Sequence, residues 1–128
     1  DLLKSLDSDY VKAVFDPANF IQCDVETYPH AFDMLKEYIE YMHIKDALYK
    51  DHSVVPAGYG NGKLSEIITA LYESDFEGFL TLEPHLGSFV GFSQLERGIV
   101  DTDLPEGGPK QFAIAANALK KLLSRIER

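Results

Sequence analysis

The sequence predicts an α/β protein with parallel strands, and two observations lead to this fold class. Three short runs rich in β-branched and aromatic residues lie at 11–16, 39–44 and 78–83, as is typical of strands. Each run is followed by a segment with helical signals, so the predicted order is β-α-β-α-β-α. Because alternating strands and helices are joined by right-handed crossovers, the strands are expected to be parallel.

The three helices are predicted from proline positions and apolar spacing, and a short helical segment at 2–6 precedes them. The first helix follows a loop and begins near Pro29, with Phe32, Leu35 and Ile39 on one face. The second shows apolar residues at i, i+3, i+4 and i+7, namely Leu64, Ile67, Ile68 and Leu71. The last helix opens at Pro109, and its predicted buried face is Phe112, Ala115, Ala116, Leu119, Leu122, Leu123 and Ile126.

Polar residues follow all three predicted strands. Asp16 ends the first, His43 lies in the second, and Glu83 ends the third. Ligands of parallel α/β folds bind at the carboxyl ends of the strands, so these side chains are expected to converge there. Two carboxylates and one imidazole suit a single divalent ion such as Mn²⁺, Zn²⁺, Co²⁺ or Mg²⁺, although the residue types do not select one of them.

Each of these residues also has an ordinary structural explanation. Asp16 before Pro17 is a common turn residue, and a single histidine in a strand is more often a core residue than a ligand. Glu83 is harder to explain structurally, because it closes a strand expected to be buried on both faces. The pattern on three successive strands favours the metal site.

The glycine-rich stretch 58–63 resembles a phosphate loop only superficially. Ala57 stands where a Walker motif needs its first glycine, and Leu64 stands where Ser or Thr is needed. The stretch is therefore expected to be a flexible loop followed by a helix start.

Three segments resemble the sugar phosphate isomerase/epimerase family, which belongs to the xylose isomerase-like TIM barrels. They are residues 14–20 (VFDPANF), 41–47 (YMHIKDA) and 78–86 (GFLTLEPHL), and the similarity extends over nearly the whole chain. The resemblance implies that the chain, residues 1–128, is the C-terminal portion of a (β/α)8 barrel. Its strands would be the sixth to eighth, with the N-terminal units absent.

The resemblance also implies roles for individual residues. Asp16, His43 and Glu83 match three of the family's four metal ligands, and the fourth, a Glu, belongs to an earlier strand. Glu83 would also be one of two glutamates that exchange protons with the substrate. The expected substrate-binding residues are Asn19, Lys45, Asp46 and His85.

The resemblance implies a metal-dependent isomerase or epimerase of sugars or sugar phosphates, with proton transfer through a metal-stabilised enediolate. A dehydratase or other lyase could use the same metal site. A further alternative is a non-catalytic half-barrel that self-associates or pairs with the missing N-terminal half, because three parallel strands leave two open edges. The fragment alone is expected to be inactive.

Length and composition limit the remaining possibilities. The chain has 128 residues, about half of the ~250 that a TIM barrel usually needs, and Asp1 is interpreted as a truncation point. The net charge of −9 argues against a nucleic-acid partner, and no apolar run is long enough to span a membrane. The single cysteine, Cys23, fits a reducing compartment, so a cytoplasmic location is expected.

Overall fold

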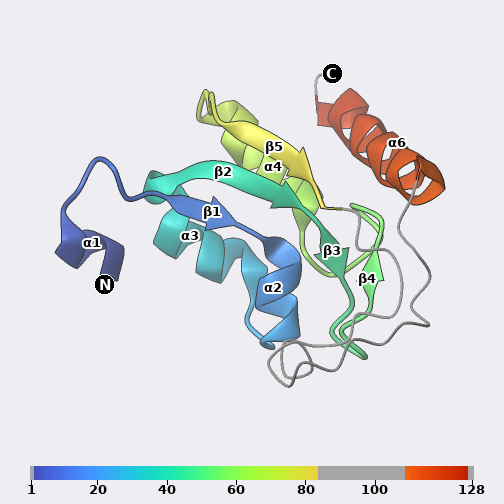
Figure 1. Cartoon of the computed structure of the whole chain (residues 1–128), viewed down its shortest axis with the longest axis horizontal. Coiled ribbons are helices and arrows are strands. Elements are labelled where there is room, and N and C mark those ends of the chain that lie inside the picture. Colours follow the sequence, from blue (N-terminus) through green and yellow to red (C-terminus); the bar gives the residue numbers. More distant parts are fainter. Residues whose placement is uncertain (1, 84–108, 127–128) are drawn as a thin grey trace.

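The computed structural model describes residues 2–83 and 109–126 (Figure 1). Three parallel strands form its sheet: β1 (Ala13–Phe15), β2 (Ile39–Ile44) and β5 (Phe79–Leu82). Strand β2 is central, with Phe15 paired to Met42 on one side and Ile44 paired to Leu82 on the other. The predicted α/β class and the parallel strands are confirmed.

The helices agree with the prediction in part. Helices α1 (Leu2–Leu6), α4 (Leu64–Glu73) and α6 (Pro109–Ile126) lie where the sequence places them. The segment between β1 and β2 is more broken, with the π-helical turn η1 (Thr27–Ala31), α3 (Phe32–Leu35) and the 3-10 turn η2 (Lys36–Tyr38). Ile39 therefore begins β2, and its predicted place on a helix face is wrong.

A short helix and a small strand pair lie where the sequence predicted loops. Helix α2 (Pro17–Gln22) begins immediately after β1, because Asp16 caps its first turn and Pro17 has a helix-ready backbone. Strands β3 (Asp46–Ala47) and β4 (Val54–Val55) form a small antiparallel pair beyond the end of β2. Both elements follow strand ends that carry candidate site residues, so they bear on the geometry of the site.

The hydrophobic core lies between one face of the sheet and the helices. Phe15, Met42 and Ile44 supply the sheet side, and α3, α4 and α6 supply the other side. The helix residues of this core are Phe32, Leu64, Ile67, Ile68, Leu71, Ala118 and Leu122. The last helix buries Ala115, Ala118 and Leu122, whereas Phe112 of its predicted face is exposed.

None of the described helices covers the opposite face of the sheet. Val14, Tyr41 and Phe79 are paired in register across the three strands, and Phe79 is 71% exposed. The expectation that the strand ending at Glu83 is buried on both faces is therefore wrong for Phe79, because the described helices pack against the other face. Among the described helices, none combines the length and the hydropathy that crossing a membrane requires.

Candidate metal centre

Asp16 is held at the site by its position at the start of α2. Its Oδ1 atom accepts a hydrogen bond from the Asn19 backbone N–H at 3.1 Å, which caps the helix. Its Oδ2 atom is buried and accepts no hydrogen bond from the residues that the structure describes. The cap therefore fixes the carboxylate and leaves one buried oxygen directed at the neighbouring strand ends.

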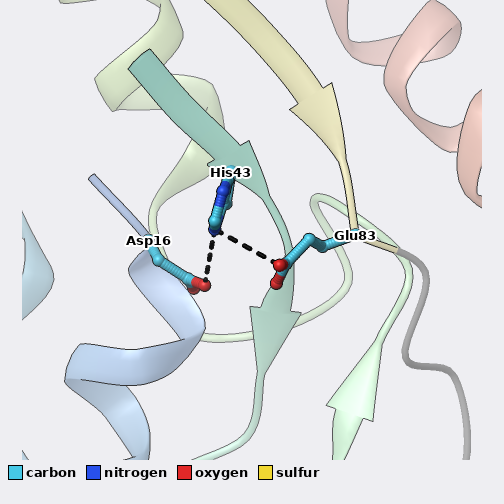
Figure 2. Close-up of side chains that lie close together, drawn as sticks. All are labelled: Asp16, His43 and Glu83. Atoms are coloured by element: carbon cyan, nitrogen blue, oxygen red, sulfur yellow. Dashed lines mark ion pairs between the residues drawn. The ribbon is translucent and has the colours of Figure 1, made fainter. Parts of the chain in front are cut away.

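His43 lies on the central strand, between the other two candidate ligands (Figure 2). Its Nδ1 atom is 3.4 Å from Asp16 Oδ2 and 3.5 Å from Glu83 Oε1, and its side chain is 28% exposed. The Tyr41 ring packs edge-on against the imidazole, with centroids 5.7 Å apart, and the Tyr41 hydroxyl accepts a hydrogen bond from Thr81 at 2.6 Å. These contacts hold the ring between the two carboxylates.

Glu83 follows β5 directly, and its position is set by the pairing of that strand with β2. Its backbone N–H donates to the Ile44 carbonyl at 3.4 Å. The side chain is 29% exposed, so the carboxylate can be reached from solvent while Oε1 points toward His43 (Figure 2). The three strand ends therefore meet, as the sequence predicted.

The three side chains fit a divalent metal ion. One ligand atom each from Asp16, His43 and Glu83 can be chosen so that all three lie within 4.8 Å of one another. Nδ1 of His43 is too far from either carboxylate for a strong hydrogen bond, and Asp16 Oδ2 is buried without one. Two carboxylate oxygens and an imidazole nitrogen suit Mn²⁺, Zn²⁺, Co²⁺ or Mg²⁺, and three ligands leave positions open for a substrate.

Lys45, expected to contact substrate, lies inside the ligand cluster. Its Nζ atom is 3.1 Å from Asp16 Oδ2 and 3.0 Å from Glu83 Oε2, and its side chain is only 6% exposed. This ion pairing was not among the sequence predictions. Alternation along an extended chain could have indicated it, because residues two apart in a strand, such as His43 and Lys45, point to the same side.

Asp46, also expected to contact substrate, is fully buried and binds the chain's own backbone. Its Oδ1 atom accepts hydrogen bonds from the N–H groups of Ala47 at 2.9 Å and Gly62 at 2.8 Å. Its Oδ2 atom accepts from Gly58 and Gly60, both at 2.9 Å. Burial raises the pKa of this carboxyl above its ordinary value of 3.8, and the four backbone hydrogen bonds oppose that shift.

The glycine-rich loop is therefore anchored, and its amide groups are already occupied by an internal carboxylate. A Cβ atom at Gly60 would collide with Asp46 and the Ala47 carbonyl, and one at Gly62 would lie 2.7 Å from Asp46 Oδ1. Thr27 also donates to the Gly62 carbonyl at 3.2 Å. The sequence prediction of a flexible loop did not include this anchor. The glycines at every second position were the signal that could have indicated it.

The remaining predicted substrate contacts are Asn19 and His85. Asn19 lies on α2, half-buried beside Asp16, and its Oδ1 atom is buried without a hydrogen bond from any described residue. Its role as a substrate contact stays a prediction. His85 lies outside the described residues.

The comparisons with known proteins agree on one fold. No curated protein is similar enough in sequence to count as a match. Among solved structures, the xylose isomerase domain protein from Planctomyces limnophilus superimposes with a TM-score of 0.67 at 22% identity. The match covers 98% of this chain and 42% of that one, so the chain spans less than half of the solved protein. The family model described as "Xylose isomerase-like TIM barrel" matches residues 1–122, and the chain belongs to this family.

Proposed function

We propose that this chain forms part of a metal-dependent isomerase or epimerase that acts on a sugar or sugar phosphate. The observation that carries the proposal is the convergence of Asp16, His43 and Glu83 at the carboxyl ends of three parallel strands. We also propose that these strands are the sixth to eighth of the barrel. An earlier strand would then supply the fourth metal ligand, a glutamate.

The proposed chemistry divides between the metal and the chain's own groups. A divalent ion held by Asp16, His43 and Glu83 would supply the Lewis acidity that makes a hydrogen beside a carbonyl acidic enough to remove. Glu83 is the proposed base, because its part-exposed carboxylate can reach a bound substrate. In an isomerase it would take the proton from one carbon and return it to the neighbouring carbon. In an epimerase it would exchange a proton on one face of the carbon, and the second glutamate, from the earlier strand, would exchange it on the opposite face.

The charge of the chain favours a small substrate over a nucleic acid. The net charge of −9 opposes a phosphate backbone, which needs many phosphate contacts over a broad basic surface. A single sugar phosphate needs far fewer positively charged contacts than a nucleic acid does. Asn19 and His85 remain the proposed polar contacts to it.

Metal binding tests the site separately from the reaction. Titration of the chain with Co²⁺, followed by visible absorption, should show one site that His43→Ala abolishes. His30→Ala is the matched control, because His30 is exposed and lies outside the cluster. Equal binding by wild type and His43→Ala would contradict the assignment of the site.

The reaction itself is tested in the gene product that contains this chain together with the rest of the barrel. Mn²⁺-supplied protein should interconvert ketoses or ketose phosphates, and Glu83→Gln should abolish turnover without unfolding the chain. Full activity in Glu83→Gln would refute the role of Glu83. A product that has lost water would identify a dehydratase on the same site.

The sheet face that the described helices leave uncovered supports a second proposal, that this chain alone associates with another copy or with the missing barrel units. Strands β1 and β5 are the edges of the sheet, and Val14 and Phe79 are exposed on it. A hollow of about 620 Å³ at the start of β2 and β5 is lined by Ile39, Glu40, Tyr41, Phe76, Glu77 and Phe79. Light scattering after size-exclusion chromatography tests this, and a stable monomer would contradict it.

A further inference from the structure

Lys45 is buried beside the candidate metal ligands, where another cation would be expected to bind. Its side chain is 6% exposed, whereas Lys36 and Lys63, which also pair with carboxylates, are 51% and 56% exposed. Lysine is almost never buried unless its ammonium group is paired. The partners of Lys45 are the two carboxylates that belong to the candidate metal site, Asp16 and Glu83.

The two carboxylates need a cation when no metal is bound. Asp16 is buried and Glu83 is partly buried, and the Oδ2 atom of Asp16 accepts no hydrogen bond from the described residues. Bringing two such anions together is unfavourable without a nearby positive charge. The Lys45 ammonium group lies within 3.1 Å of both and supplies that charge.

Lys45 also divides the carboxylate oxygens between itself and the rest of the site. It donates to Glu83 Oε2 at 3.0 Å, while Oε1 of the same carboxylate faces His43. Asp16 has only Oδ2 to offer, because Oδ1 caps α2, and this oxygen is shared by Lys45 and His43. A cation entering the site therefore meets the Glu83 oxygen that faces His43, and it must compete with Lys45 for the one available oxygen of Asp16.

We propose that Lys45 is a built-in counter-cation of the metal site. It holds Asp16 and Glu83 together before the metal arrives, fixes Glu83 as a one-oxygen ligand, and lowers the affinity for a divalent ion. This role rests on the proposed metal site. It makes Lys45 a positioning residue, and its like charge keeps the bound metal exchangeable.

The test compares Lys45→Met with the wild-type chain and with Lys36→Met, whose lysine pairs with Asp33 on the surface. Two quantities are measured: the melting temperature in EDTA, and the dissociation constant for Co²⁺ from its visible absorption. For Lys45→Met we expect a melting temperature lower by about 5–10 °C, because two carboxylates lose their cation. We also expect Co²⁺ affinity to rise about tenfold or more, because a positive charge beside the site is removed. Lys36→Met should change neither quantity.

The two measurements separate this role from ordinary packing, because replacing a merely structural lysine would lower stability and metal affinity together. Equal or weaker Co²⁺ binding by Lys45→Met, with wild type binding normally, overturns the inference alone. Absence of Co²⁺ binding in both proteins overturns the proposed metal site and this inference with it. If Lys45→Met does not fold, Lys45→Gln decides by the same Co²⁺ titration, and Lys45→Arg, which keeps the charge, should bind as wild type does.

Discussion

Replacing Asp46 by Asn tests whether one buried carboxylate organises the end of β2 and the glycine-rich loop. The change keeps the size and shape of the side chain, so packing is preserved. It replaces one of the two accepting oxygens by an NH₂ group, which donates and cannot accept. If the amide oxygen takes the place of Oδ1, Ala47 and Gly62 keep their acceptor, while Gly58 and Gly60 lose theirs.

The expected cost follows from the two orphaned backbone donors. A buried donor left without its acceptor costs about 1–3 kcal/mol, and the N–H groups of Gly58 and Gly60 are only partly buried. The two losses are not strictly additive, so we expect Asp46→Asn to lower the free energy of unfolding by about 2–4 kcal/mol. For a chain of this length that corresponds to a melting temperature lower by roughly 10 °C.

Urea unfolding at neutral pH, followed by circular dichroism, measures this free energy. Asp33→Asn is the matched control, because Asp33 is exposed and its pairing with Lys36 should be worth less than about 1 kcal/mol. If Asp46→Asn unfolds within about 0.5 kcal/mol of wild type, the reasoning is refuted, and the carboxylate does not hold the loop.

Two further predictions concern the same anchor. Gly60→Ala should lower the melting temperature by at least as much as Asp46→Asn, because its new methyl group collides with Asp46 and the Ala47 carbonyl; thermal unfolding checks this, and an unchanged melting temperature would contradict it. The stability difference between wild type and Asp46→Asn should also depend on pH. Because the pKa of Asp46 is raised above its ordinary 3.8, the folded chain binds the proton more readily than the unfolded chain. The contribution of Asp46 to the free energy of unfolding therefore falls as pH rises from about 3.8 through the raised value. Urea titrations of both proteins across that range check the sign, and a difference that grows with pH would refute it.

The main elements and the ligand cluster could be predicted because they depend on the spacing and order of residues along the sequence. Helix α4 shows its apolar spacing directly, and α6 opens at Pro109. The meeting of Asp16, His43 and Glu83 follows from a general property of parallel sheets, in which all strands end at the same edge.

The sequence did not predict the short elements, or the contacts that side chains near them make with the backbone of other segments. Helix α2 has six residues, too few for a clear period, and only its Asp-Pro start marked it. The β3–β4 pair has two residues per strand, and its pairing depends on hydrogen bonds rather than side-chain pattern. Strand alternation and the alternate glycines were signals for the roles of Lys45 and Asp46, but neither signal identifies the partner atoms that each side chain meets after β2.

The central place of β2 has a consequence for how the chain acquires its site. His43 meets its partners only when β1 and β5 are both paired with β2, and Lys45 and Glu83 are 38 residues apart in sequence. Non-local pairings of this kind form slowly compared with local contacts, and no single segment of the unfolded chain contains the ligand set. If this cluster holds a divalent ion, as we propose, the ion would bind the assembled sheet in preference to the unfolded chain and would shift the folding equilibrium by mass action. Metal supply during refolding would then raise the yield of folded chain.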